Sequence, residues 1–343
     1  MSQSYKNFYE KVKKEFTPVA TAKIRADRIL YLDFIKIFAA FLTVFYHLAY
    51  YYLDYGFMPG MTYYPNLSRV VMCFASCCVP LFFMVNGSLM LGHERRIRDV
   101  YLKAVKIAFL TVVWSFLDFP SWFFKTLCIL YVLFPIFQFI KNRSEKLYYI
   151  ICGIVFLFPF TYNLIIMVIK FIGLADITIF GVTLPINSLD RTGFFSTYSI
   201  LYFLLGPILS TAKKLPILLD LSLVFSGLTL VVLECVVYTN LTDTMFDGVN
   251  DAFPTIGALL LSTGLFLFFK KFSFKIIAKP LLFICNGIFA IYILHISIIK
   301  FIPTMFSESL LLSLLVSFVI CLTGASVGKL ASKIPMICWF FKI

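Results

Sequence analysis

Residues 30–53, LYLDFIKIFAAFLTVFYHLAYYYL, decide the fold of this chain. The stretch is apolar and long enough to cross a membrane as one helix, yet it contains Asp33, Lys36 and His47. At about 100° per residue, Lys36 and His47 point within about 20° of the same direction, and Asp33 lies about 40° from His47. Each ionisable group costs roughly 2.5–3.5 kcal/mol in a bilayer. We therefore expect the charged face of this helix to line a polar site.

The composition is that of an integral membrane protein. Of the 343 residues, 61% are hydrophobic and 14% are charged, whereas soluble domains contain about 25% charged residues. The apolar runs have the length of membrane helices rather than of barrel strands. The sequence predicts an all-α membrane protein with about ten transmembrane helices, near residues 30–53, 66–91, 101–118, 121–140, 147–169, 195–212, 216–238, 252–270, 279–301 and 307–328.

The loops between these spans alternate in charge. Of the 30 Lys and Arg residues, 24 lie in the two tails and in every second loop, whereas the other loops are acidic or neutral. Basic loops face the cytoplasm, so both termini are predicted to be cytoplasmic. The predicted parts are a basic tail at 1–29, a transmembrane domain at 30–328 and a second tail at 329–343. The longest loop, about 170–194, is expected to form a short extracellular hairpin or an interfacial segment.

Charge and cysteine content argue against two other classes of protein. The net charge of +13 could indicate a nucleic-acid partner, but the basic residues form short clusters between apolar spans, as membrane topology requires. Membrane lipids, and no nucleic acid, are therefore expected around this chain. The nine cysteines lack the paired spacing of a zinc site, so no metal is expected.

Two histidines are expected to lie at the same depth. His47 is about 18 residues into the first span, and His295 is about 17 residues into the ninth span, which runs in the same direction. At 1.5 Å per residue, Lys36 should lie about 16 Å further toward the cytoplasm. His47 titrates near neutral pH when unperturbed, which suits a general base. For His295, an ordinary hydrogen bond between helices is an equally good interpretation.

A second group of polar residues lies at the end of the second span and directly after it. Asn86 and Ser88 interrupt an apolar helix, where small and polar side chains either allow close packing or let a ligand approach. Arg95, Arg96 and Arg98 come directly after it. They either anchor the topology or bind a phosphorylated ligand, because arginine clusters suit phosphates.

Some basic residues lie on the predicted extracellular side, among them Arg69 and Lys125. They break the charge pattern of the other loops. We expect each to bind an anionic lipid or a pyrophosphate-linked substrate, or simply to extend to the membrane interface.

The sequence resembles the acyltransferase-3 family of bacterial membrane proteins over nearly its whole length. That family opens with a basic residue, ten further residues and a histidine, which matches Lys36 and His47, with Asp33 in its usual place. Four later segments also match the family: CVPLFFMVNGSLML (78–91), SWFFKTLCILYVLFPIF (121–137), YFLLGPILS (202–210) and NGIFAIYILHISII (286–299).

The resemblance implies O-acylation in the bacterial inner membrane by a multi-pass enzyme. An acyl group, usually acetyl, would move from cytoplasmic acyl-CoA to a hydroxyl of a cell-surface polysaccharide or lipid-linked glycan. Acetyl-CoA or another acyl-CoA would be a substrate, with no bound cofactor, and glycan-synthesis machinery is a further candidate partner. By this resemblance Lys36 and His47 are the catalytic motif, and the cluster from Arg95 to Arg98 helps to hold the CoA phosphates. Together with the residue patterns above, the predicted site residues are His47, Lys36 and Asp33 for catalysis; Arg95, Arg96, Arg98, Asn86 and Ser88 for the donor; and His295, Tyr292, Trp122, Lys125 and Arg69 for the acceptor or a secondary site.

The chemistry of these residues leaves several roles open. His47 would take the proton of the attacking hydroxyl or carry the acyl group transiently, and Lys36 would stabilise charge on the thioester oxygen. A transporter or flippase of a lipid-linked oligosaccharide or exopolysaccharide is the rival class, and it would act without acyl-CoA. A structural partner of a glycan-synthesis complex is the third class. Neutral residues in place of Lys36 and His47 would then leave glycan acylation unchanged.

Overall fold

The computed structural model describes residues 28–50, 60, 62–116, 121–161, 164–165, 168, 172, 176–179, 182–185, 197–303 and 309–341. These residues are helical except for turns and one antiparallel pair of strands, β1 (Asp176–Ile179) and β2 (Val182–Pro185). The all-α expectation is confirmed for the helical bundle, and the hairpin predicted within 170–194 is confirmed as a two-stranded hairpin. The side of the membrane on which it lies stays a prediction. Residues 1–27 of the predicted N-terminal tail lie outside the described residues.

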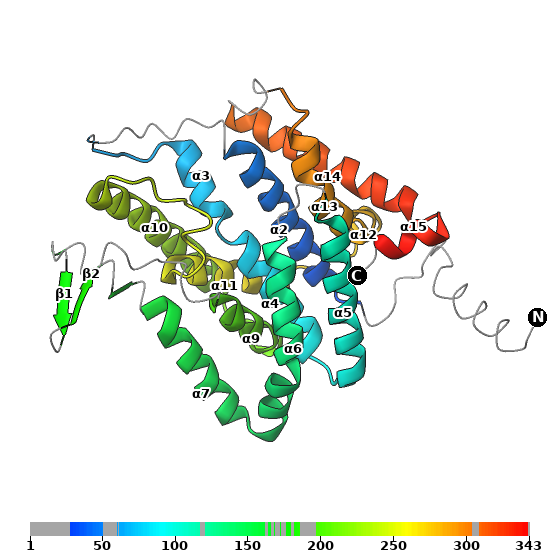
Figure 1. Ribbon diagram of the computed structural model, residues 1–343, viewed down its shortest axis with the longest axis horizontal. Helices are drawn as coiled ribbons and strands as arrows, with labels where there is room; N and C mark the ends of the chain where they lie inside the picture. The colour runs from blue at the N-terminus through cyan, green and yellow to red at the C-terminus, as the bar shows by residue number, and fades with distance from the viewer. Residues whose placement is uncertain are drawn as a thin grey trace, which may run out of the picture.

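The helices form one bundle around the first of them, α2 (Figure 1). Their bounds are α2 Leu30–Ala49, α3 Leu67–Ala75, α4 Cys78–Leu91, α5 Ile97–Trp114, α6 Trp122–Arg143, α7 Glu145–Phe156 with the π-turn η1 Leu157–Thr161, α9 Tyr198–Thr211, α10 Ile217–Thr242, α11 Ile256–Lys270, α12 Ala278–Asn286, α13 Ile288–Ile299, α14 Leu310–Ala331 and α15 Pro335–Phe340.

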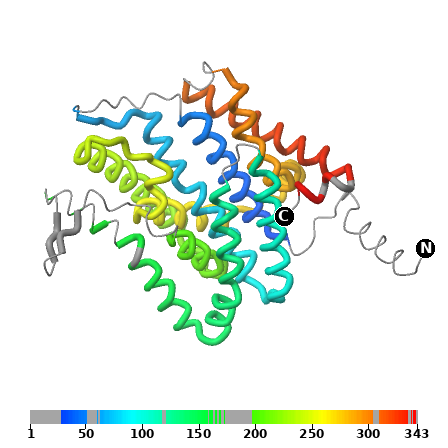
Figure 2. The backbone as a smooth tube through the Cα atoms, in the orientation of Figure 1, coloured from blue at the N-terminus to red at the C-terminus, as the bar shows by residue number. Residues whose placement is uncertain are grey.

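Helix α2 lies at the centre because it is apolar on most of its circumference. It packs against α3, α4, α11, α12, α13 and α14, and the tube in Figure 2 shows it between α3 and α4 on one side and the C-terminal helices on the other. Ala39, Ala40 and Ala49 are buried and allow neighbouring helices to approach closely. Polar side chains on such a helix are surrounded by protein rather than by lipid.

Helices α4 and α9 touch through their backbones. A Cβ atom built on Gly87 would lie 1.8 Å from the carbonyl oxygen of Phe203, and one on Gly206 would lie 2.0 Å from that of Met84. Ser88 is buried between the same helices and donates to the carbonyls of Met84 and Gly206, at 3.0 and 2.7 Å. Of the two interpretations of the polar residues in α4, this geometry favours close packing for Ser88.

Helices α12 and α13 form a bent pair. Their axes differ by 62°, and the break falls at Gly287, where a Cβ atom would lie 2.5 Å from the Cα atom of Ala325 in α14. Only glycine allows this contact, which holds the pair against α14. Because the pair runs beside α2, its two halves present residues to both ends of that helix.

Within the described residues, five helical segments are long and apolar enough to cross a membrane: α2, α3 with α4, α6, α10 and α14. The bent pair α12–α13 raises this number to six. Helices α9 and α11 are apolar but shorter, α7 has only 12 residues, and α5 carries charged side chains along its first half. Six of the ten predicted spans thus have membrane length here, while ten spans and the orientation of the termini stay predictions.

The C-terminal residues pack along α5. Helix α14 continues to Ala331, three residues past the predicted end of the transmembrane domain. At the end of α15, the carbonyl oxygen of Phe340 accepts a hydrogen bond of 3.2 Å from Trp114 Nε1, and Lys106 Nζ lies 4.9 Å from the centre of the Trp339 ring. The segment predicted as a tail therefore covers part of the bundle.

Candidate active site

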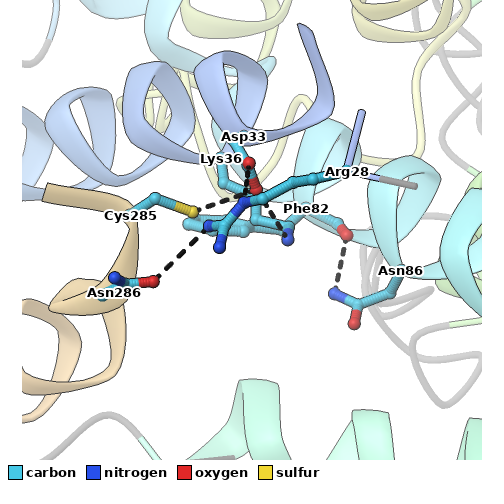
Figure 3. Close-up of polar contacts among 7 residues, drawn as sticks. All are labelled: Arg28, Asp33, Lys36, Phe82, Asn86, Cys285 and Asn286. Carbon is cyan, nitrogen blue, oxygen red and sulfur yellow. Dashed lines mark hydrogen bonds and ion pairs between the residues drawn. The ribbon is translucent and has the colours of Figure 1, made fainter. Parts of the chain in front are cut away.

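Three charged side chains meet at the Leu30 end of α2, and together with Cys285 they form what we call the charged cluster (Figure 3). Asp33 is buried and accepts a 2.6 Å hydrogen bond from Arg28 Nε. Lys36, one turn along the helix, pairs with the other carboxylate oxygen at 3.6 Å. The thiol of Cys285, at the end of α12, lies 3.1 Å from that oxygen. Asp33 and Lys36, which the sequence places on one face of the helix, thus form an ion pair.

The charged cluster carries an excess of positive charge. Burial lowers the pKa of Arg28, but its hydrogen bond and charge interaction with Asp33 outweigh burial, so the pKa is raised above its ordinary value and the guanidinium stays charged. The carboxylate of Asp33 is thus paired with two cations, Arg28 and Lys36. Both cations keep an open side, since their side chains are 31% and 25% exposed. Such a site suits an anionic ligand.

A second layer of polar groups lies beside the charged cluster. Asn86 donates to the carbonyl of Phe82 at 2.8 Å and accepts from the hydroxyl of Tyr131 at 3.2 Å. Lys103 Nζ lies 5.5 Å from the centre of the Tyr131 ring, and its charge interacts with those of Lys36 and Arg95. Lys103 therefore adds a cation that the sequence interpretation left out, although it lies in the basic run that singled out Arg95.

The three arginines of the predicted donor site are not equivalent. Arg95 is tied to the end of α4, because its guanidinium donates to the carbonyl of Leu89 at 3.2 Å and its carbonyl accepts from Gln138. Arg96 directly precedes α5, Arg98 lies in its first turn, and both are exposed. All three side chains are exposed, and Arg95 is the one whose charge interacts with that of Lys103 beside the charged cluster.

The two histidines meet at the other end of α2, in agreement with the similar depth predicted for them. The ring centres of His47 and His295 are 5.1 Å apart, with the planes tilted by 46°. His295 is fully buried in α13, and His47 is only partly buried. His47 lies eleven positions after Lys36, which is about 16 Å along a helix. The bent pair therefore contacts both ends of the charged face of α2.

A polar loop closes over this end of α2, and the sequence interpretation used it only as an acidic loop. The ring of Tyr46 lies 4.9 Å from that of His47, and its hydroxyl donates a 2.6 Å hydrogen bond to Asp247. Asn250 donates to the Tyr46 hydroxyl at 2.6 Å and to Asp247 at 3.0 Å. We call Tyr46, Asp247 and Asn250 the loop cluster. No sequence signal joins residues that are 200 positions apart, so only the fold reveals it.

Aromatic side chains lie close to the histidines and to the loop beside them. Tyr292 is buried, and its ring lies 5.6 Å from that of His295 and 4.9 Å from that of Phe124. Trp122 lies at the start of α6, 6.1 Å from Phe253 of the same loop that carries the loop cluster. Both predicted aromatic residues thus lie near the histidine pair or the loop.

The two basic residues predicted on the far side of the membrane have different surroundings. Lys125 is exposed on α6. Arg69 is only 2% exposed, and its Nε lies 3.3 Å from the sulfur of Cys235 in α10. The interpretation of Arg69 as a side chain that extends to the membrane interface is therefore wrong, because it is enclosed between α3 and α10. Within the described residues, no group of three or more His, Cys, Asp or Glu could hold a metal ion.

The fold and this site define a class of protein: a helical, multi-pass membrane protein with cations at one end of a central helix and paired imidazoles near the other. The comparison with known families gives the class its name. The sequence model described as an acyltransferase domain, that of the acyltransferase-3 family, matches residues 99–328, and the chain belongs to this family. No curated protein and no solved structure matches the chain.

The family match covers one of the two histidines. It includes α5 to α14 up to residue 328, and so it includes His295, Tyr292 and Trp122. It begins after α2, so Asp33, Lys36 and His47 lie outside it. What joins these residues to the matched part is the structure, through the contacts of Asp33 with Cys285 and of His47 with His295.

Proposed function

We propose that this acyltransferase is an O-acyltransferase of the bacterial inner membrane. It moves an acyl group, acetyl in the simplest case, from cytoplasmic acyl-CoA to a hydroxyl of a cell-surface or lipid-linked glycan. The observation that carries the proposal is the arrangement along α2, where one helix places a cationic cluster about 16 Å from a pair of imidazoles. Acyl-CoA has the matching form, with phosphates at one end and a thioester at the end of a long flexible arm.

The charged cluster is the proposed site for the phosphates of the donor. Arg28 and Lys36 share a single carboxylate, and Lys103 and Arg95 add further positive charge beside them. Phosphate oxygens would complete the pairing of these cations. The basic loops that are predicted to be cytoplasmic lie next to this end, which agrees with a donor that comes from the cytoplasm.

Lys36 and His47 have different tasks in this proposal. A separation of about 16 Å is too long for both to act on one carbonyl. Lys36 is therefore assigned to donor binding rather than to the charge on the thioester oxygen. His47 is assigned to the reacting groups, because it is the imidazole that is partly exposed.

The reaction then follows from His47. The acceptor hydroxyl attacks the thioester carbonyl, a C–O bond forms and the C–S bond breaks, and His47 takes the hydroxyl proton and passes it to the departing CoA sulfur. The loop cluster and the aromatic residues beside it support an acceptor rich in hydroxyl groups, because carboxylate, amide and aromatic side chains together bind sugars well.

Loss of ester groups from the cell surface tests this function. Deleting the gene should remove an O-acyl ester from one surface polysaccharide, measured by NMR of the purified glycan, and a plasmid copy should restore it. A transporter would instead change the amount of glycan on the surface while its esters stay in place. Unchanged ester content in every surface glycan would contradict the proposal.

A further inference from the structure

The hydrogen bonding of His295 fixes the position of its proton. Nδ1 lies 2.7 Å from the backbone carbonyl oxygen of Tyr292. A carbonyl oxygen only accepts hydrogen bonds, so Nδ1 must be the protonated nitrogen of the neutral ring. The lone pair of His295 is therefore on Nε2, and the ring is a hydrogen-bond acceptor on that side.

Nε2 of His295 lacks a partner in the part of the chain that the structure describes. The residue is fully buried, and no described group donates to this nitrogen. Leaving a buried polar atom unpaired costs free energy, so such an atom indicates a partner that arrives or moves. As an acceptor, Nε2 can bind only a group that donates a hydrogen bond.

The ring of His47 lies beside that of His295. An N–H···N bond of about 2.9 Å, with a ring radius on each side, gives a centre-to-centre distance of about 5 Å. The observed 5.1 Å is close to this length, although His295 Nε2 makes no hydrogen bond with a described group. Rotation of an imidazole about its Cβ–Cγ bond is soft, so a small turn of His47 closes the bond.

We propose that His295 is a positioning residue for His47. Its Nε2 accepts a hydrogen bond from one N–H of His47, which leaves the other nitrogen of His47 with its lone pair toward the acceptor hydroxyl. The chain of groups is then hydroxyl, His47, His295 and the Tyr292 carbonyl, with only His47 touching substrate. When His47 holds the hydroxyl proton, the bond to His295 stabilises the imidazolium until the proton leaves with the CoA sulfur.

This inference rests on the proposed function, and two variants of His295 test it in the full chain. In His295→Gln the side-chain oxygen reaches about as far as Nε2 and still accepts a hydrogen bond, whereas the shorter side chain of His295→Asn cannot reach His47. With acetyl-CoA and the glycan as substrates, Asn should lower kcat about tenfold or more at nearly unchanged KM values, and Gln should restore at least a third of the wild-type kcat. Thermal unfolding in detergent verifies that both variants fold.

Two results would overturn the positioning role while leaving the function intact: an Asn variant with wild-type kcat, or Gln and Asn variants that are folded and equally slow. Failure of the proposed function is distinct, because wild-type protein would then transfer no acyl group at all.

A spectroscopic measurement tests the proposal without changing His47 or His295. The chain has only three histidines, so nitrogen-15 labelling of histidine in untagged protein in nanodiscs gives three imidazoles, and His93→Gln removes the loop residue from the spectrum. The proposal requires His295 to be protonated at Nδ1, with Nε2 coupled through a hydrogen bond to a nitrogen of His47 when acyl-CoA is bound. A proton on Nε2 of His295, or no coupling in the bound state, would contradict it.

Discussion

The role proposed for Lys36 differs from the role that its sequence position indicates, because of the residues around it. Its spacing from His47 indicated a residue of the reaction itself, and its ion pair with Asp33 was predictable from their separation by one turn. The presence of Arg28 and Cys285 on the same carboxylate was not predictable, because one precedes the helix and the other comes from α12, 252 residues away. In the proposed function, these neighbours assign Lys36 to the cation site for the donor rather than to a catalytic pair.

Replacing Lys36 with glutamine tests this assignment. Because one charge-assisted hydrogen bond is worth about 1.5–3 kcal/mol, Lys36→Gln should raise the KM for acyl-CoA about tenfold or more, with kcat within about threefold of wild type. Initial rates at varied acyl-CoA concentration measure both constants.

Lys271→Gln is the matched control, since Lys271 also pairs with a buried carboxylate, that of Asp220, at a separate place in the bundle. It should reduce stability and leave the KM for acyl-CoA unchanged. A Lys36 variant with normal KM and strongly reduced kcat would show that Lys36 acts on the reacting carbonyl instead.

At the scale of the elements, close backbone contacts set the geometry of the site. Gly87 of α4 and Gly206 of α9 each lie against the backbone of the other helix, which fixes α4 against α9. The bend at Gly287 lets α12 and α13 reach both ends of α2. The motifs that contain these glycines were visible in the sequence, and so was the equal depth of the two histidines. The bend was not visible, because an isolated glycine in an apolar run is compatible with a straight helix.

Adding one methyl group should disrupt the contact between α4 and α9. In Gly206→Ala the new Cβ atom would lie 2.0 Å from a backbone oxygen and 2.6 Å from a backbone nitrogen, so neither neighbour can turn aside as a side chain would. Overpacking of this kind costs about 1–3 kcal/mol, and we expect a lower unfolding temperature and less folded protein in detergent.

Gly153→Ala in α7 is the control for this change, because a Cβ atom there meets nothing within 4 Å. Alanine is the better helix former by about 1 kcal/mol, so this variant should be as stable as wild type or slightly more stable. Equal stability of the two variants would mean that α4 and α9 do not pack through their backbones.

For the whole molecule, sequence and structure agree on the class of protein but contribute different parts of it. Charge distribution and apolar runs predicted a multi-pass helical protein, and the family match confirms the acyltransferase class. Neither could reveal the loop cluster, because Tyr46 and Asp247 meet only through the path of the chain over the end of α2. The fold therefore adds the loop cluster to the proposed acceptor side, whereas periodicity on α2 predicted only that Asp33, Lys36 and His47 share one face of the helix.

The central claim is that acyl-CoA enters at the charged cluster and reacts at His47, and transfer in membrane vesicles tests it most directly. Inverted vesicles from cells that produce the acceptor glycan expose the cytoplasmic face, and they receive radiolabelled acetyl-CoA. We predict label in the glycan with wild-type protein, little or none with sealed right-side-out vesicles, and at least a hundredfold less with folded His47→Ala. Wild-type transfer rates in the His47→Ala vesicles would contradict the account.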